Sequence, residues 1–354
     1  MSYEHFMYRE VLEQPEVFEK IIKGKRDEIN KIAEKMIKRK FDSIYFIGCG
    51  SSYYASQIGS FYISNYTNLY TNALPSSEFI YYKPSYIKKG SLLVFLSRSG
   101  ETTETVKALK YAKKLGLETL AISNNPNSSL AKEAKYFIDI NAGEEKSVVM
   151  TKTFSGSILI LQLLAFRISI LKRNKTIKKF LNEIEKLPNY ARQLIKNEEE
   201  KIKKIVDKYN SYKIIFLGSG PNYPISLESA LKLRETSYLM TESFHVLEFR
   251  HGPMAEVDEK TLIIIIAPKG IDKKIFIDLM KDIKNKNGEI LAITNIKEIL
   301  EEATVSINLP EGILEEISPS ISVIPNQLFA YYTSIGKGYD PDNPRHLSKV
   351  VKLK

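Results

Sequence analysis

The sequence predicts an α/β protein with two tandem doubly wound αβα sandwich domains, parallel sheets and a C-terminal tail. Three observations support this fold class. Short continuous apolar runs, expected for buried parallel strands, end in polar turns and alternate with helical patterns. The second half of the chain repeats the first. With 354 residues, the chain is long enough for two domains.

The elements of the first half follow one another in the order that a parallel sheet requires. The helical patterns cover residues 13–39, with a break at Pro15, then 54–62 and 104–115. The apolar runs that predict strands cover residues 43–47, 92–96, 119–122 and 136–140. Each of the first three strands runs into a polar turn, so we expect a ligand at this edge of the sheet.

Three segments of the first half return in the second half, in the same order and at an offset near 170 residues. They are FIGCGSSYYAS (46–56) and FLGSGPNYPIS (216–226), LLVFLSRSG (92–100) and LIIIIAPKG (262–270), LAISNN (120–125) and LAITNI (291–296). We interpret this as an internal duplication. The predicted segments are a helical arm (1–24), a first, phosphate-binding domain (25–175), a helical linker (176–208), a second, catalytic domain (209–335) and a tail (336–354).

Hydroxyl side chains follow two strands of the first half, and most are absent from the matching places of the second half. They belong to Ser51, Ser52, Ser97, Ser99 and Thr102. The second half has Pro221, Asn222, Ala267 and Lys269 in place of the four serines, so the fold does not require them. Ser and Thr also cap helices, which is the alternative role. Because helix N-termini at strand ends favour anions, we predict a phosphate site. The turns lack the spacing of dinucleotide and P-loop motifs.

One helix of the second half carries a compact set of acid–base groups. Glu228, Lys232 and Glu235 fall at i, i+4 and i+7 and share one face. A solvated Glu/Lys stripe is the alternative interpretation. The segment Arg250-His251-Gly252-Pro253 follows. Together with a phosphate site, these groups indicate aldose–ketose chemistry on a sugar phosphate, with Glu235 as the proton base and His251 as the ring opener.

Composition argues against several other classes of protein. The net charge is +10, but the lysines are spread along helices and form no aromatic-interleaved basic stretch, so no nucleic-acid partner is expected. Cys49 is the only cysteine and the four histidines show no ligand spacing, so we expect no metal and no cofactor. The apolar run 154–171 contains Gln162 and Arg167, as a core helix does. Without a signal-peptide pattern, we expect a cytoplasmic protein with no membrane partner.

Specific motifs along almost the whole chain are similar to those of one known family. They are Glu13-Gln14-Pro15, residues 49–52, Ser77-Glu78-Phe79, residues 97–102, Ala142-Gly143-Glu144, Leu217-Gly218, Tyr223-Pro224-Ile225, residues 230–233 and Pro344-Arg345. The chain resembles the sugar isomerase (SIS) family, and within it the isomerase half of glucosamine-6-phosphate synthase, also called glutamine–fructose-6-phosphate aminotransferase. The resemblance implies flavodoxin-like SIS domains, a sugar phosphate substrate, and a homodimer with shared active sites.

The resemblance also implies roles for five catalytic residues. Glu235 would move the proton between C1 and C2, with Lys232 beside it and Glu228 in support. His251 resembles the ring-opening histidine, which the family supplies from the neighbouring subunit. Lys349 matches the family's C-terminal lysine on the substrate side.

On the binding side, the resemblance implies phosphate contacts from Ser52, Ser97, Ser99 and Thr102, and a sugar-side loop that contains Val148. The chain departs from the synthase at four places, and one of them, residues 248–253, resembles the deaminase and deglycase branch more than the synthase. Arg98 replaces a glutamine and adds a charge beside the phosphate, and Met150 replaces a small polar residue of the sugar-side loop. The sequence also begins directly in the isomerase half, so we expect no release of ammonia from glutamine.

These departures favour glucosamine-6-phosphate deaminase, which combines aldose–ketose isomerisation with loss of ammonia from C2 to yield fructose 6-phosphate. Another SIS enzyme is the second hypothesis: a fructosamine-phosphate deglycase, an N-acetylated amino-sugar phosphate deaminase, or a plain phosphosugar isomerase. The third hypothesis is a non-catalytic phosphosugar sensor or the partner subunit of a separate glutaminase.

Overall fold

The computed structural model describes residues 5–270 and 272–351, and these form two compact units. The C-terminal unit comprises the described residues of 1–15, 146–151 and 186–347. The N-terminal unit comprises those of 16–145, 152–185 and 348–354. The predicted linker is divided between them, because α9 (Lys178–Ile184) packs in the N-terminal unit and α10 (Leu187–Tyr209) in the C-terminal unit. The domain boundaries given in the sequence analysis remain predictions. Residues 1–4 of the predicted arm and 352–354 of the predicted tail lie outside the described residues.

The N-terminal unit contains a five-stranded parallel sheet with the strand order β2-β1-β3-β4-β5, which is the flavodoxin-like order. Its strands are β1 (Ser43–Gly48), β2 (Tyr70–Pro75), β3 (Ser91–Leu96), β4 (Glu118–Ser123) and β5 (Tyr136–Asp139). All except β2 were predicted. The sequence pattern missed β2 because it is a partly exposed edge strand, YTNALP, without a continuous apolar run.

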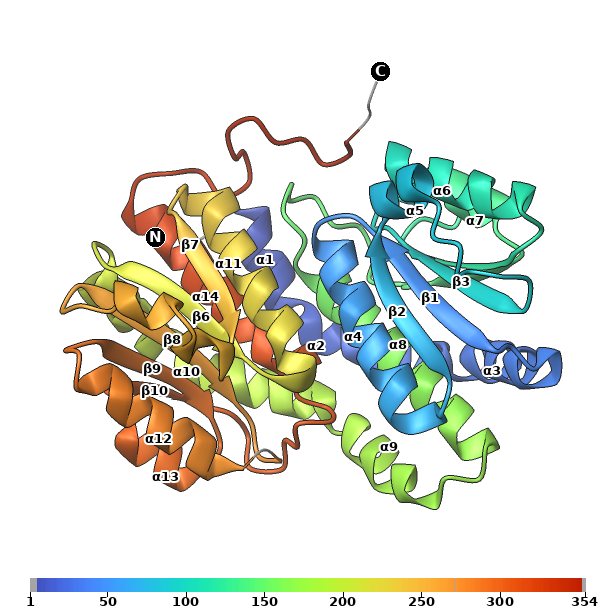
Figure 1. Cartoon of the computed structure of the whole chain (residues 1–354). Coiled ribbons are helices and arrows are strands. Elements are labelled where there is room, and N and C mark those ends of the chain that lie inside the picture. The colour runs from blue at the N-terminus through green and yellow to red at the C-terminus, as the bar shows by residue number, and fades with distance from the viewer. Residues whose placement is uncertain (1–4, 271, 352–354) are drawn as a thin grey trace. The chain divides into compact units, whose positions relative to one another are not determined.

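Helices cover both faces of this sheet, as a doubly wound fold requires (Figure 1). The helices are α2 (Gln14–Gly24), α3 (Arg26–Arg39), α4 (Ser51–Thr67), α5 (Ser76–Tyr82), α6 (Thr103–Lys114), α7 (Ser129–Glu133), α8 (Lys152–Leu171) and η1 (Lys175–Ile177). Tyr45, Ile47 and Phe95 pack against α5 and α6. Phe46 faces the opposite way, toward α4 and α8, because side chains alternate along a strand.

Helix α8 contains the longest apolar run of the chain. By length and composition alone, it could cross a membrane, but 78% of its most apolar window is buried inside the structure. Its polar Gln162 donates to the hydroxyl of Tyr62 at 2.8 Å, so this buried amide is satisfied within the unit. These features are typical of a core helix, as the sequence predicted.

The C-terminal unit contains a second five-stranded parallel sheet, with the order β7-β6-β8-β9-β10. Its strands are β6 (Lys213–Gly218), β7 (Thr241–His245), β8 (Thr261–Ala267), β9 (Glu289–Thr294) and β10 (Val305–Asn308). When the strands of each sheet are numbered along the chain, both sheets have the same spatial order, 2-1-3-4-5. The two parallel sheets with their flanking helices confirm the predicted fold class, while the duplication stays an interpretation of the sequence.

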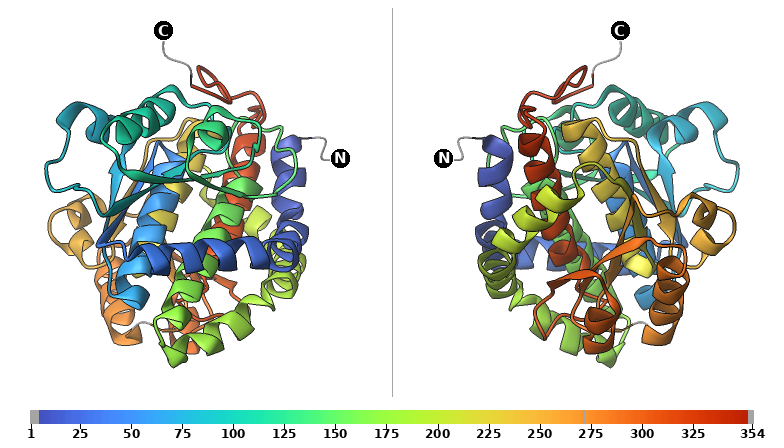
Figure 2. Two further views of the ribbon diagram at one scale, coloured as in Figure 1. Left: turned by 90° about the vertical axis from the view of Figure 1, so that its right-hand side faces the viewer. Right: turned by 90° about the vertical axis from the view of Figure 1, so that its left-hand side faces the viewer.

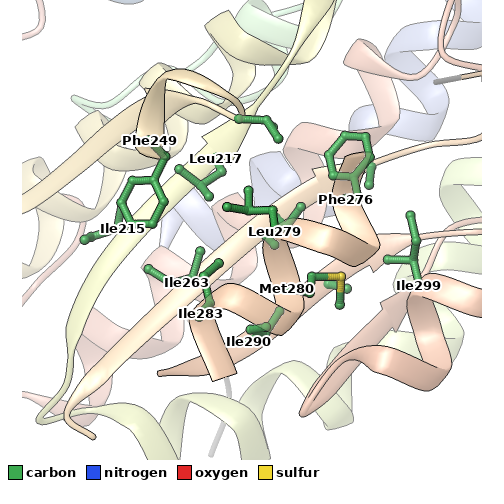
Figure 3. Packing of buried hydrophobic residues seen from close by; sticks show 14 of the residues in the cluster. Ile215, Leu217, Phe249, Ile263, Phe276, Leu279, Met280, Ile283, Ile290 and Ile299 are labelled. Carbon is green, nitrogen blue, oxygen red and sulfur yellow. The ribbon is translucent and has the colours of Figure 1, made fainter. Parts of the chain in front are cut away.

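Helices also cover both faces of the second sheet. They are α1 (Phe6–Leu12), α10, η2 (Gly220–Asn222), α11 (Tyr223–Ser237), η3 (Glu248–Arg250), η4 (Pro253–Glu256), α12 (Lys273–Lys284), α13 (Lys297–Glu302) and α14 (Pro319–Gly336). Figure 3 shows the core on one face, where Phe276 and Leu279 of α12 meet Ile263 of β8. Helices α10, α11 and α14 pack together on the other face. In both views of Figure 2, α1 runs beside α14.

Candidate active site

The acid–base residues of α11 form a buried ion-pair triad. Lys232 Nζ lies 3.1 Å from Glu228 Oε1 and 2.5 Å from Glu235 Oε2. The side chains of Glu228 and Lys232 are 0% and 1% exposed, whereas that of Glu235 is 19% exposed. A solvated stripe is therefore excluded. Glu235 is the one carboxylate of the triad that can reach a ligand.

Lys232 stays charged in this position. Burial alone would lower the pKa of Lys232, but the neighbouring carboxylates of Glu228 and Glu235 outweigh burial and raise it above its ordinary value. A lysine with a raised pKa keeps its proton throughout the neutral range. Lys232 therefore acts as a fixed positive charge beside Glu235 and not as a proton base.

Helix α11 is held in place by α14 and by the start of the tail. Thr236, next to Glu235, donates to the carbonyl of Ala330 at 3.3 Å, and its own carbonyl accepts from Ser334 at 2.8 Å. Tyr238 ends α11 in the left-handed conformation. Its ring lies 3.7 Å from the guanidinium carbon of Arg345, and its hydroxyl accepts the Arg345 amide at 2.9 Å. The helix that carries Glu235, the predicted base, is thus fixed to a buried frame.

His251 lies on an exposed loop whose anchor is a buried aromatic ring. Phe249 of η3 is 0% exposed and packs beside Ile215 and Leu217 in the core (Figure 3). Arg250 forms bonds of 2.6 and 2.9 Å with Asp282 of α12, so it is a structural residue of this loop. Among residues 5–270 and 272–351, no hydrogen bond or ion pair joins His251 to the triad. The structure therefore does not bring the predicted ring opener together with Glu235.

In the N-terminal unit, the turn after β3 collects hydroxyl groups. Ser97 Oγ lies 3.2 Å from Thr102 Oγ1 and accepts the Gly100 amide at 3.1 Å, while Ser99 Oγ accepts the Glu101 amide at 3.1 Å. Gly100 has φ +66°, and a Cβ there would overlap the buried Ser128 hydroxymethyl group. The turn therefore requires glycine. Thr102 is the N-cap of α6, so its neighbours are the first amides of a helix.

The turn after β1 places two further serines at a helix start. Ser51 and Ser52 are the first residues of α4 and are 7% and 8% exposed. Gly50 is the N-cap and, as a glycine, has no side chain with which to cap the helix. A Cβ on Gly48 would lie 2.7 Å from the carbonyl of Ser52, so only glycine permits this close approach. The N-terminus of α4 follows the carboxyl end of β1, and the partial positive charge of a helix start favours an anion there.

Arg98 is engaged by a residue that the sequence did not single out. Its Nη1 lies 3.2 Å from the carboxylate of Glu145, whose side chain is 1% exposed. Glu145 also accepts from the amide and hydroxyl of Thr153, at 3.0 and 2.5 Å. Arg98 Nη2 donates to the carbonyl of Lys349 at 2.7 Å, and Lys349 Nζ donates to the carbonyl of Glu145. The structure thus joins two predicted site residues through Glu145.

Val148 lies half-buried in residues 146–151, which pack in the C-terminal unit although both flanking segments belong to the other unit. The residues that hold this loop, Glu10 among them, were not predicted. No sequence signal could have identified Glu10 or Glu145, because each forms its contacts with residues distant in the chain or outside any regular element. Among the residues that the structure describes, no group of three or more His, Cys, Asp or Glu side chains could hold a metal ion.

Comparison with known proteins follows the same division of the chain. The model of the SIS domain matches residues 36–167 and 209–336. Glutamine–fructose-6-phosphate aminotransferases (isomerizing) of Caldanaerobacter subterraneus subsp. tengcongensis and Buchnera aphidicola subsp. Baizongia pistaciae are 32% and 36% identical over 99% of this chain. The chain spans 59% of the length of these relatives.

Two solved structures are similar over nearly the whole chain. The C-terminal domain of glucosamine-fructose-6-phosphate aminotransferase from Francisella tularensis has 28% identity and a TM-score of 0.87, over 97% of this chain and 99% of that one. Glucosamine-6-phosphate deaminase from Thermotoga maritima has 28% identity and a TM-score of 0.76, over 98% of this chain and 100% of that one.

Proposed function

Because the chain belongs to the SIS domain family, we propose that it converts glucosamine 6-phosphate and water to fructose 6-phosphate and ammonia. It is related to the isomerase part of glutamine–fructose-6-phosphate aminotransferases, and the deaminase reaction is the specific proposal. The buried Glu228–Lys232–Glu235 triad is the observation that carries it. A carboxylate held beside a permanent positive charge suits proton transfer next to a carbonyl group.

The proposed reaction begins with ring opening, which His251 assists by moving the proton between the ring oxygen and the C1 hydroxyl. Glu235 then takes the C2 proton of the open aldose, the electron pair forms a C1–C2 double bond, and the C1=O π bond breaks as the C1 oxygen takes up a proton. Return of the C2 proton to C1 leaves a protonated imine at C2. Water adds to this imine and ammonia leaves, which yields the ketose. Lys232 would stabilise the carboxylate form of Glu235, since its raised pKa keeps it protonated.

The phosphate is proposed to bind in the N-terminal unit. The candidate ligands are Ser51, Ser52, Ser97, Ser99 and Thr102, with Arg98 as the charged member. Support comes from Ser51 and Ser52 at the start of α4 and from the hydroxyls around the glycine turn after β3. Lys349 is proposed to act on the substrate side, close to Arg98 in this unit.

The deaminase is proposed because a solved deaminase is similar to this chain and because residues 248–253 resemble the deaminase and deglycase branch. The similarity to the Thermotoga maritima glucosamine-6-phosphate deaminase extends over the whole of that chain. Arg98 adds a charge beside the proposed phosphate site and does not distinguish a deaminase from the other SIS enzymes. A fructosamine-phosphate deglycase or a plain phosphosugar isomerase remains the second candidate, because Met150 in the sugar-side loop changes the predicted contacts there.

The test is release of ammonia and fructose 6-phosphate from glucosamine 6-phosphate in the absence of glutamine. Equal amounts of both products are expected from the wild type, and neither from a Glu235→Gln variant that still folds. Fructosamine 6-phosphate without ammonia would indicate a plain isomerase. If no product appears, deglycase substrates are next, and then glutamine-dependent synthesis with an added glutaminase, which would identify a partner subunit.

We further propose a cytoplasmic homodimer in which His251 serves the neighbouring subunit. Mixing two inactive variants, Glu235→Gln and His251→Ala, tests this directly. Random exchange of subunits should restore about one quarter of the wild-type activity, because one active site in four then contains both native residues. If the mixture stays inactive although mass spectrometry detects mixed dimers, His251 does not act across the interface.

A further inference from the structure

Residues 146–151 are clamped at their first end by a buried carboxylate. Glu10 of α1 is 3% exposed, and its carboxylate accepts from the Lys146 amide and from both the amide and the hydroxyl of Ser147. The Ser147 hydroxyl also donates to the Val149 carbonyl at 2.8 Å. A buried carboxylate is costly unless such donors surround it, so the donors fix the position of this end of the loop.

The last residue of the loop, Thr151, is held by the buried side-chain amide of Gln327, which the buried amide of Gln14 holds in turn. Gln327 Nε2 of α14 donates to the carbonyl of Thr151 at 3.2 Å. Gln14 Nε2 donates to Gln327 Oε1 at 2.8 Å and to the Val11 carbonyl at 3.1 Å. The side chains of Gln14, Gln327 and Thr151 are all 0% exposed. Val148 lies between the two clamps.

The same helix that holds the end of the loop also holds the proton-transfer helix. Besides Gln327, α14 provides the carbonyl of Ala330 and the hydroxyl of Ser334 to Thr236, the residue after Glu235. Both partners of α14 lie within the C-terminal unit. The relative positions of Val148 and Glu235 are therefore set by one buried frame. A buried polar network of this kind adds little net stability compared with apolar packing, but it specifies one geometry.

We propose that Glu10 and Gln327 are positioning residues, which fix the loop Lys146–Thr151 so that it forms the sugar-side wall for the Glu235 reaction. This inference rests on the proposed function. The helix at the N-terminus would thus serve sugar recognition through the loop that Glu10 holds. The phosphate ligands proposed above lie on other segments, in the N-terminal unit.

The experiment compares Glu10→Gln and Gln327→Met with a matched control, Glu198→Gln. Glu198 is also a buried helical carboxylate of the C-terminal unit, is 6% exposed and accepts from Asn308 at 3.0 Å, but it has no link to the loop. For each full-length protein, one measures kcat and KM with glucosamine 6-phosphate and the inhibition constant of inorganic phosphate. Circular dichroism verifies folding.

In both loop variants, kcat/KM should fall by at least about tenfold, because a displacement near 1 Å can cost about 100-fold. The inhibition constant of inorganic phosphate should change less than about twofold. This separates a displaced loop from an unfolded protein, which would lose both turnover and phosphate binding. Glu198→Gln should keep nearly wild-type kinetics. Wild-type kinetics in folded Glu10→Gln and Gln327→Met, or an equal loss in Glu198→Gln, would overturn the inference.

If the wild type turns over no hexosamine phosphate, the proposed reaction fails and a binding measurement decides the inference. Calorimetry then compares the affinities of fructose 6-phosphate and inorganic phosphate. If Glu10 positions the loop, Glu10→Gln should lower the ratio of the affinity for fructose 6-phosphate to the affinity for inorganic phosphate. An unchanged ratio of the two affinities, or no preference in the wild type, refutes the positioning role.

Discussion

Replacing Lys232 by methionine tests the buried triad most directly, because the side chain keeps its length and loses only the ammonium group. The wild-type ammonium lies 3.1 Å from Glu228 and 2.5 Å from Glu235, and its side chain is 1% exposed. In the variant, the carboxylate of Glu228, 0% exposed, loses its charged partner in the core. Breaking a buried ion pair in this way costs about 3–5 kcal/mol of unfolding free energy.

The same variant should also change how the free energy of unfolding depends on pH, because the charged group left in the core is then a carboxylate. In the wild type, the pKa of Lys232 is raised, so its stabilisation is fully present below the ordinary lysine range and disappears only as the pH rises through the raised value. In Lys232→Met, burial favours the neutral form of Glu228, so the variant should regain stability as the pH falls from about 8 to 5.

The assay is urea-induced unfolding followed by circular dichroism at pH 8 and at pH 5. The control is Lys297→Met, which removes another i,i+4 pair of the same unit, with Glu301 at 3.6 Å and side chains 83% and 63% exposed. That exposed pair should contribute no more than about 1 kcal/mol. If both variants lose equal stability, or if Lys232→Met is less stable at pH 5 than at pH 8, the explanation given for the triad is wrong.

Three further predictions concern other sites. Arg98→Gln should raise KM for glucosamine 6-phosphate more than it lowers kcat, since a phosphate contact acts on binding before the chemical step; steady-state kinetics would contradict this if kcat alone fell. Gly100→Ala should lower stability by about 1–3 kcal/mol and weaken phosphate binding, because φ is +66° and Ser128 blocks a Cβ; unchanged thermal unfolding and phosphate affinity would exclude a strained turn. Burial, with a smaller effect of Glu316, raises the pKa of Glu315 to about 7, so its charge opposes folding increasingly between pH 4.5 and 7. Glu315→Gln should therefore unfold at higher urea than the wild type at pH 8 but not at pH 4, and equal midpoints at pH 8 would refute the shift.

Much of the fold could be predicted from the sequence because the information is local. A buried parallel strand is a short apolar run, so β1, β3, β4 and β5 were recognisable, and the repeat revealed β6, β8 and β9 as the counterparts of the first three. The edge strand β2 was not predicted, because it is partly exposed and its composition resembles that of a loop. The spacing of Glu228, Lys232 and Glu235 likewise predicted a shared helix face.

Spacing alone could not say whether that face lies in water or in the core. Burial depends on α14, whose contacts with α11 come from residues about 100 positions away. The pKa of Lys232 follows from this burial and from the two carboxylates, so it belongs to the tertiary structure. The same holds for Arg98, whose partner Glu145 lies 47 residues further along the chain.

The sequence by itself determined the fold class, the glycine turns and the residue types from which a phosphate site and an acid–base helix can be built. These depend on the period of apolar side chains and on backbone conformations that only particular residues adopt. Only the tertiary structure decided which carboxylates are buried, that Glu10 and Gln327 hold the loop of Val148, and that residues 146–151 pack apart from their neighbours in sequence. The physical reason is that hydrogen-bond partners and local dielectric are set by segments distant in sequence, which no local pattern records.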